Sequence, residues 1–408
     1  MQKQPTLSQR GINTPTSVIR ELNPLAEAAK EKGIRVYHVN IGDPDFPIPD
    51  EIKKSLHSFA NQQAKLPYPA FRGQKSLLAA WRKYYKDITI PVDFVDEDMI
   101  ITAGASNALI NVMAATADPG EEILVLEPFY APYLTHAGFV SVKLISVALD
   151  AAKNYHLPSK EEIVAKITPK TKAILFTHPN NPTGTVFRRD EMELLIEIAK
   201  EYGLYIISDE TYRGLVFEDR ECLSMFEVAQ KEDLNTIIVV DSLSKRLNVC
   251  GARVGAIVSK NQEFMAAAFR FTQGLPFAAY IEQEIVHTQL ANCVSYIQFL
   301  KGEYQKRRDV FINALNTYLH ADIPKPEGAF YAMIQLPIDN SVTFAKWLLT
   351  DFQENNETVM VSPGSGFYTT PGKGANEIRV AYILQEKDLE RAAELLAHAI
   401  KRYNEVNK

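Results

Sequence analysis

The sequence predicts an α/β protein whose mostly parallel sheet, of the seven-stranded type, is sandwiched by helices, with a smaller α+β domain built from both termini. Strand-length apolar runs recur through residues 98–259, helical patterns separate them, and a further amphipathic helix lies outside this zone. The chain has 408 residues, enough for two or three domains of roughly 150 residues each.

The apolar runs in this zone have the length of strands rather than helices. They are nearly continuous in hydrophobic residues, which is typical of strands covered on both faces by helices. In chain order they are residues 99–102, 123–126, 173–176, 204–207, 236–240 and 254–258. Because ligands of such sheets bind beyond the carboxyl ends of the strands, we expect the functional site in the loops that follow these runs.

Helical periodicity is visible between the runs. Met192, Leu195, Ile196 and Ala199 fall at positions i, i+3, i+4 and i+7, and Gly203 follows as the predicted end of that helix. This pattern predicts a crossover helix between two parallel strands.

A second helical stripe near the carboxyl end predicts the smaller domain. Leu389, Ala392, Ala393 and Leu396 repeat with helical spacing among charged residues. We therefore divide the chain into residues 1–45 (small domain), 46–305 (large, cofactor-binding domain) and 306–408 (the rest of the small domain).

Composition and charge favour a small-molecule partner in the cytoplasm. Lys and Arg total 44 against 50 Asp and Glu, so the net charge of −6 argues against nucleic acid and membrane surfaces as partners. The three cysteines form no CxxC pair, no signal peptide is visible, and no apolar run approaches the ~18 residues that cross a bilayer. We therefore expect a cytoplasmic protein.

Several site classes lack their motifs. The eight histidines form no HxxxH or HExxH motif and no cluster with cysteine, so no metal site is expected. There is no GxSxG elbow, no GxGxxG fingerprint and no Walker loop. These absences argue against α/β-hydrolases, Rossmann enzymes and P-loop enzymes.

Polar clusters follow the predicted strands where the carboxyl edge of the sheet should lie. They are residues 104–106 (Gly-Ala-Ser), 180–184 (Asn-Asn-Pro-Thr-Gly), 209–212 (Asp-Glu-Thr-Tyr), 242–245 (Ser-Leu-Ser-Lys) and 251–253 (Gly-Ala-Arg). Pyridoxal-phosphate (PLP) chemistry needs a lysine to form a Schiff base, an acid to hold the pyridine nitrogen protonated and donors for the phosphate. The clusters supply all three.

The offsets between these clusters resemble those of the class I/II, fold-type I PLP-dependent aminotransferases, and the resemblance runs from about Gly42 through Arg379. The segments that carry it are IGDPDF at 41–46, ITAGASNAL at 101–109, HPNNPTGTV at 178–186, SDETY at 208–212, SLSKRLNVCGARVG at 242–255, PEGAFY at 326–331 and IRV at 378–380. Several ordered motifs at compatible spacings are far more specific than any one of them.

The resemblance implies roles for the central residues. Lys245 carries the cofactor as a Schiff base and then, as a free amine, shuttles the proton at the substrate Cα, a task that calls for a lowered pKa. Asp209 pairs with the pyridine N–H and keeps the ring cationic. Tyr212 and Asn181 hydrogen-bond the phenolic oxygen of the cofactor.

The resemblance also implies a phosphate cradle at the start of a helix, where backbone N–H groups attract anions. Its residues are Gly104, Ala105, Ser106, Ser242, Ser244 and Arg253. Arg253 follows Lys245 by eight residues, an offset typical of the family. Tyr130 occupies the position where the family stacks an aromatic ring on the pyridine face.

Substrate binding and assembly follow from the same resemblance. Arg379 grips the substrate α-carboxylate through two parallel hydrogen bonds, assisted by Gly42 and Asn181. Tyr68 matches the tyrosine that crosses to the phosphate of a neighbouring subunit. We therefore expect a homodimer with shared active sites, and an amino acid and a 2-oxo acid as substrates.

The leading functional hypothesis is a ping-pong aminotransferase that moves an amino group between an L-amino acid and a 2-oxo acid. A PLP-dependent lyase of the same fold, acting on cysteine conjugates or forming aminocyclopropane carboxylate, is the alternative that the common motifs leave open. Some aspartate-using members carry a Lys where this chain has Ser106, which puts dicarboxylate specificity in doubt. The aromatic residues Tyr130, Tyr133 and Phe367 favour an apolar or aromatic donor instead.

Overall fold

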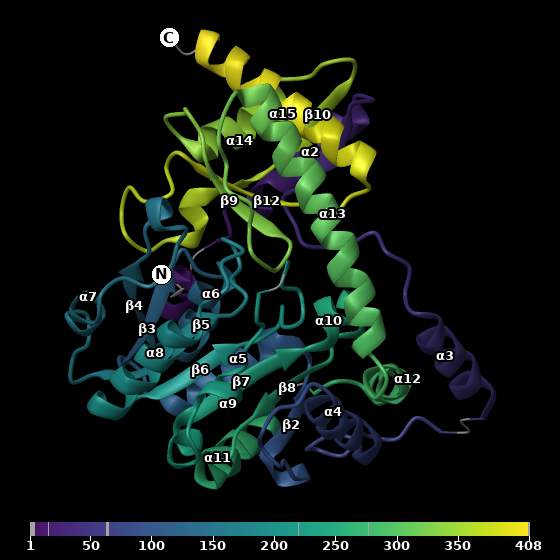
Figure 1. Cartoon of the computed structure of the whole chain (residues 1–408), viewed down its shortest axis with the longest axis vertical. Helices are drawn as coiled ribbons and strands as arrows, with labels where there is room; N and C mark the ends of the chain where they lie inside the picture. The colour runs from purple at the N-terminus through teal and green to yellow at the C-terminus, as the bar shows by residue number, and fades with distance from the viewer. Residues whose placement is uncertain (1–4, 15, 63–64, 219, 276, 407–408) are drawn as a thin grey trace.

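The computed structural model describes residues 5–14, 16–62, 65–218, 220–275 and 277–406. The large sheet with its helices forms one part of the molecule, and the smaller part combines the amino-terminal segment with the carboxyl-terminal third of the chain (Figure 1). Within the described residues, no helix has both the length and the apolar character needed to cross a membrane.

The central sheet has seven strands in the order β2-β8-β7-β6-β5-β3-β4. Their bounds are β2 (Met99–Thr102), β3 (Glu122–Glu127), β4 (Lys143–Ala148), β5 (Thr171–Thr177), β6 (Tyr205–Asp209), β7 (Ile237–Ser242) and β8 (Gly255–Val258). Only β8 runs antiparallel to its neighbours β2 and β7, so the prediction of a mostly parallel sheet is confirmed. The sequence prediction missed β4, an edge strand whose side chains are mostly half-exposed and form no continuous apolar run.

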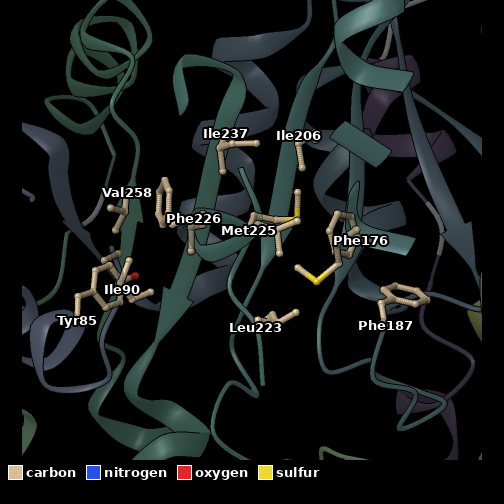
Figure 2. Packing of buried hydrophobic residues seen from close by; sticks show 14 of the residues in the cluster. Tyr85, Ile90, Phe176, Phe187, Ile206, Leu223, Met225, Phe226, Ile237 and Val258 are labelled. Atoms are coloured by element: carbon tan, nitrogen blue, oxygen red, sulfur yellow. The ribbon is translucent and has the colours of Figure 1, made fainter. Parts of the chain in front are cut away.

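Helices cover both faces of this sheet. Consecutive strand residues point to opposite sides, and apolar side chains on both sides have to be buried. On β6, Ile206 belongs to the core that includes side chains of α4 (Lys75–Asp87), α8 (Arg189–Tyr202), α9 (Met225–Val228) and α12 (Tyr280–Leu290). Ile207 belongs to a second core, which includes side chains of α5 (Gly104–Thr116), α6 (Pro132–Val140) and α11 (Gln262–Thr272). Figure 2 shows part of the first core, including Ile206, Phe176 and Met225. As predicted, Gly203 ends α8, with a left-handed φ of 66°.

The small domain has two sheets of its own. In one, β1 (Arg35–His38) pairs in parallel with β10 (Glu357–Met360), and in the other the order is β11 (Ser362–Pro363), β12 (Glu377–Ala381) and β9 (Tyr331–Gln335). The main helices packed around them are α2 (Asn23–Glu31), α13 (Val294–Leu319), α14 (Ser341–Thr350) and α15 (Glu386–Val406). The predicted domain boundary at residue 305 falls inside α13, a continuous helix that leads from the large part into the small one (Figure 1).

The remaining helices are short or lie at the periphery. They are α1 (Gln9–Asn13), α3 (Asp50–Gln62), α7 (Lys160–Val164) and α10 (Leu243–Arg246). Of these, α10 directly follows β7, so its residues lie at the carboxyl edge of the central sheet.

A fully buried ion pair fixes α10 to the end of β7. The Arg246 guanidinium donates to both carboxylate oxygens of Asp241, at 2.6 and 3.1 Å, and both side chains have no solvent exposure. Asp241 also accepts hydrogen bonds from Trp81 Nε1 at 3.1 Å and from the Tyr85 hydroxyl at 3.2 Å. Removing one partner of such a pair leaves an uncompensated charge in the core.

We therefore expect Arg246→Met to lower the free energy of unfolding by about 3–5 kcal/mol, because the Asp241 carboxylate stays buried without its cation. Guanidinium denaturation followed by circular dichroism measures this. The control is Lys30→Met, which removes an exposed ion pair with Glu27 and should leave the midpoint unchanged. Equal denaturation midpoints for Arg246→Met and Lys30→Met would contradict the stabilising role of the buried ion pair.

Candidate active site

One cavity lies at the carboxyl ends of β6 and β7, next to the first turn of α5. Its lining residues are Ala105, Ser106, Tyr130, Asp209, Thr211, Tyr212, Ser242, Ser244, Lys245, Cys250 and Arg253. Most of the residues that the sequence predicts for cofactor binding thus meet here, because parallel strands end at the same edge of the sheet.

Asp209 is the last residue of β6 and supplies a buried carboxylate. It is 3% exposed and accepts hydrogen bonds from the Thr211 hydroxyl at 2.6 Å and the Tyr133 hydroxyl at 2.9 Å. Burial raises its pKa above the ordinary value, while these two donors oppose the rise. A cationic N–H group placed in the cavity would pair with this carboxylate and favour its charged form.

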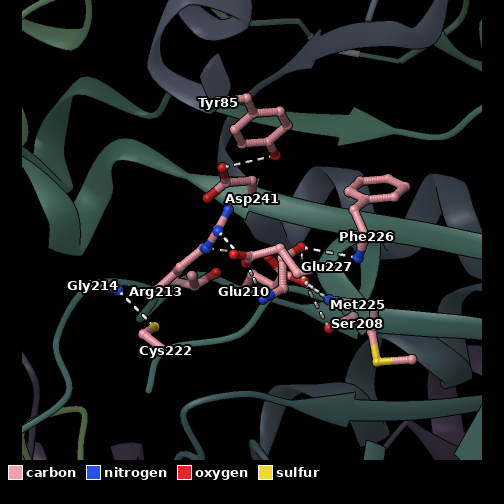
Figure 3. A network of polar contacts seen from close by, with 12 residues as sticks. Tyr85, Ser208, Glu210, Arg213, Gly214, Cys222, Met225, Phe226, Glu227 and Asp241 are labelled. Atoms are coloured by element: carbon pink, nitrogen blue, oxygen red, sulfur yellow. Dashed lines mark hydrogen bonds and ion pairs between the residues drawn. The ribbon is translucent and has the colours of Figure 1, made fainter. Parts of the chain in front are cut away.

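The next carboxylate, Glu210, anchors the loop after β6 through a network of polar contacts (Figure 3). It accepts hydrogen bonds from the Ser224 hydroxyl at 2.8 Å and the Met225 amide at 3.0 Å. Burial raises the pKa of Glu210 to about 7. The Arg213 guanidinium lies 3.8 Å from the Glu210 carboxylate and donates to Glu227 at 2.8 Å. These contacts fix the loop that follows Asp209.

Lys245, in α10, points into the cavity from the side of β7. Its Nζ donates to the carbonyl oxygen of Gly42 at 2.6 Å and lies 5.8 Å from the ring centre of Phe330. Burial lowers the pKa of Lys245, but the phenol of Tyr331 and the thiol of Cys250 outweigh this, so the pKa is raised overall. The residues of the cavity therefore do not supply the lowered pKa that the sequence analysis expects for Lys245.

An anion cradle forms where α5 begins. Gly104 has a left-handed φ of 79°, and a Cβ added there would lie 2.5 Å from Nη2 of Arg253. This close approach places the guanidinium beside the free N–H groups at the helix start, which attract anions. The hydroxyls of Ser242 and Ser244 lie 3.0 Å apart and line the same cavity.

A hydrogen-bonded chain links the cavity to the small domain. Asn181 Nδ2 donates to the Tyr212 hydroxyl at 3.1 Å, and Asn181 Oδ1 accepts from Arg379 Nη1 at 3.1 Å. The Tyr212 hydroxyl in turn donates to the Tyr331 hydroxyl at 3.2 Å. The predicted residues Tyr212, Asn181 and Arg379 therefore act as one connected group.

Arg379 lies on β12 and is only 6% exposed. Its guanidinium packs between two rings, 4.4 Å from the centre of Tyr331 and 4.8 Å from that of Phe367. It also donates to Ser362 Oγ at 3.3 Å, while its buried Nε has no hydrogen-bond partner among the described residues. An unpaired N–H of a buried guanidinium is suited to bind a carboxylate.

Two predicted residues lie at the edge of this arrangement. Gly42 faces Lys245 through its carbonyl, and a Cβ added there would lie 1.9 Å from the Tyr331 hydroxyl. Tyr68, in contrast, is 93% exposed and makes no part of the cavity in the single chain. The role that the sequence analysis predicts for Tyr68, at a phosphate, would therefore require a second copy of the chain.

A larger cavity, of about 630 Å³, adjoins the first through the shared residues Ser106 and Tyr130. Its walls include residues 16–20, 130–132, 134–136, 365–366 and 368, and Arg20 is the one cationic side chain among its described lining residues. Neither Tyr133 nor Phe367 serves as an aromatic wall for a substrate. Tyr133 faces Asp209, and Phe367 packs on Arg379.

Sequence reasoning missed several functional neighbours. Thr211 and Tyr133 support Asp209, Tyr331 supports Tyr212, and Cys250 lies 3.1 Å from Lys245 Nζ. Thr211 lies in the segment SDETY and Cys250 in the segment SLSKRLNVCGARVG, so both positions could have been identified as neighbours of the site from the sequence. Within the described ranges, no group of three or more His, Cys, Asp or Glu side chains is arranged to hold a metal ion.

Comparison with known proteins identifies the family. The family profile "Aminotransferase class I and II" matches residues 34–396. The aspartate aminotransferase of Thermotoga maritima is 31% identical over 88% of this chain and 92% of its own length. The aspartate/prephenate aminotransferase of Thermus thermophilus is 28% identical over 97% of this chain and 99% of its own.

Solved structures give the same result for the fold. The aspartate aminotransferase of Thermotoga maritima superimposes with a TM-score of 0.87 at 28% identity, over 97% of this chain and all of that one. The Thermus thermophilus enzyme with maleate gives 0.87 at 26% identity with the same coverage. The profile match, the relatives and the shared fold show that this chain belongs to the class I and II aminotransferases.

Proposed function

We propose that this aminotransferase uses PLP bound to Lys245 and transfers an amino group between an L-amino acid and a 2-oxo acid in a ping-pong cycle. One observation carries the proposal: a buried carboxylate, an anion cradle and a lysine amine converge on one cavity. The members of that group are Asp209, the start of α5 with Arg253, and Lys245.

The residues present fit PLP, which when bound supplies an aldehyde for the lysine and a ring that withdraws electrons from the substrate Cα. The phosphate would be held by the N–H groups at Gly104–Ser106, by Arg253 and by the two serines. Asp209 would accept a hydrogen bond from the pyridine N–H. The opposite charges would keep the carboxylate ionised and the pyridine nitrogen protonated. Tyr212 and Asn181 would orient the phenolic oxygen, and Tyr130 would cover one ring face.

The substrate is bound and converted by groups of both domains. Arg379 and Asn181 fix the α-carboxylate, which orients the Cα–H bond toward Lys245. Once free, the Nζ of Lys245 would take the proton from the Cα of the amino donor and pass it to the cofactor. In the half-reaction with the 2-oxo acid, the same Nζ would deliver a proton to the Cα of the acceptor. The position of the small domain thus controls the distance between the carboxylate clamp and the base.

The proposed assembly is a cytoplasmic homodimer. The single chain leaves Tyr68 93% exposed and Phe71 50% exposed. Exposed aromatic side chains close together in sequence suit an interface between copies, with Tyr68 reaching the phosphate of the neighbouring site.

The first test of the function is the visible absorption of the PLP-loaded protein with single amino acids, covering Asp, Glu, Ala, Phe, Met and Lys. We expect the visible absorption band of the bound PLP to decrease with the true donors and to return when a 2-oxo acid is added. Release of pyruvate or ammonia without this cycle would show elimination and overturn the proposal.

Lys245→Ala should abolish transamination and covalent PLP attachment while the fold is retained, because no other amine lines the cavity among the described residues. Borohydride reduction followed by intact-mass measurement detects the attachment, and circular dichroism checks the fold. Lys54→Ala, on the exposed side of α3, is the matched control. Retained turnover in Lys245→Ala would refute the mechanism.

Arg379→Ala should reduce kcat/KM by about ten- to a hundredfold, since a charged hydrogen bond to the carboxylate is lost. Arg379→Lys should recover part of this, because it keeps the charge without the two-pronged geometry. Steady-state kinetics with one donor measures both, and Arg402→Ala at the exposed end of α15 serves as control. An unchanged kcat/KM would remove the carboxylate assignment.

We further propose that Arg20 receives the distal carboxylate of dicarboxylic substrates, because the similar proteins include aspartate aminotransferases and Arg20 lines the adjoining cavity. Arg20→Ala should then raise KM for aspartate by about tenfold, whereas KM for alanine should stay within a factor of two. Parallel kinetics with the two donors decides this. Equal effects on both donors would mean that Arg20 does not read the distal carboxylate.

A further inference from the structure

Cys250 lies beside the reactive amine of the cavity. Lys245 Nζ donates a hydrogen bond to its sulfur at 3.1 Å, and the thiol in turn donates to the carbonyl oxygen of Ser244 at 3.3 Å. Cys250 is partly buried, forms no disulfide and lines the same cavity as Lys245. It is therefore not an isolated cysteine but a hydrogen-bonded neighbour of the proposed nucleophile.

The two partners of the Lys245 amine are both acceptors. The carbonyl oxygen of Gly42 takes one N–H at 2.6 Å, and the sulfur of Cys250 takes another. A neutral amine has only two N–H bonds, so once both are directed to these acceptors its lone pair is left pointing away from them. That direction is the one in which an amine attacks an aldehyde or accepts a proton.

The orientation of the thiol supports this arrangement. Because its hydrogen is directed to the Ser244 carbonyl, the lone pairs of the sulfur remain available for the Lys245 N–H. The carbonyl of Cys250 also accepts from Arg253 Nη1 at 2.9 Å, which ties the same residue to the anion cradle. Cys250 is thus fixed at both its backbone and its side chain.

We propose that Cys250 is a positioning residue for Lys245: together with the Gly42 carbonyl, its sulfur orients the amine so that the lone pair faces the bound aldehyde and, later, the substrate Cα. This inference rests on the proposed PLP function. It gives Cys250 a role in orienting the amine, which the family resemblance does not imply for any residue of the segment SLSKRLNVCGARVG.

The test measures how fast the cofactor-free chain captures PLP on Lys245, with borohydride trapping and intact mass as the readout. In Cys250→Ala we expect the capture rate at its high-pH plateau to fall by about three- to tenfold, because one N–H of the amine loses its acceptor. Cys250→Ser keeps an acceptor and should recover most of the rate. Cys293→Ala, which removes a buried thiol outside the cavity, should behave as wild type.

The pH profile of capture separates positioning from a merely structural role. Cys250 contributes to the raised pKa of Lys245, so its loss should move the midpoint of the profile to lower pH. The other titratable or charged groups that face the amine are the same in all variants: Tyr130, Asp209, Tyr212, Arg253 and Tyr331. An unchanged plateau and midpoint in Cys250→Ala would overturn the proposal.

Binding of pyridoxine phosphate, which has no aldehyde, completes the test. Equilibrium dialysis should give the same affinity for wild type and Cys250→Ala, because Lys245 forms no bond with this compound. If Cys250→Ala weakens it as much as it slows capture, the cysteine only shapes the cavity and the proposal is wrong. If wild type itself captures no PLP, the proposed function fails instead.

Discussion

The active site depends on the buried ion pair between Asp241 and Arg246. Asp241 is the last residue but one of β7, and Arg246 directly follows Lys245, so the ion pair closes a short segment that contains Lys245. Ser242 and Ser244 lie within that segment. A charge pair without solvent exposure has few alternative arrangements, because each displaced partner leaves an unpaired charge in the core. The backbone that carries the lysine is therefore held rigidly.

The loop after β6 follows the same design with different residues. Asp209 faces the cavity, and its neighbour Glu210 faces the core, where serine and backbone donors and Arg213 surround it. Adjacent carboxylates at the end of a strand point to opposite sides, so Asp209 lines the cavity and Glu210 anchors the loop. Both sites use buried charge to fix geometry, which suits an enzyme whose groups need accurate placement.

The third part of the site comes from the small domain. Arg379 on β12 meets Asn181 of the large domain, and Lys245 reaches the carbonyl of Gly42, in the segment after β1. In the proposed function, these contacts make both domains necessary for substrate binding and for the chemistry. Cys250 completes the surroundings of the amine from the large domain, so the orientation of Lys245 depends on contacts with both parts of the chain.

The sequence by itself determined the fold class, the family and most residues of the cavity. A strand that is buried on both faces needs a continuous apolar run, which is visible in the sequence. The cavity residues lie in loop motifs that are also local in the sequence, because each role needs a particular side chain. It did not determine β4, whose half-exposed residues leave no apolar run, or the supporting contacts of Tyr133 and Tyr331. Those contacts join residues far apart in the chain, 76 positions for Tyr133 and Asp209 and 119 for Tyr212 and Tyr331. Only the packing of the strands and domains brings such side chains together, and only tertiary structure could show that the sulfur of Cys250 faces the amine of Lys245.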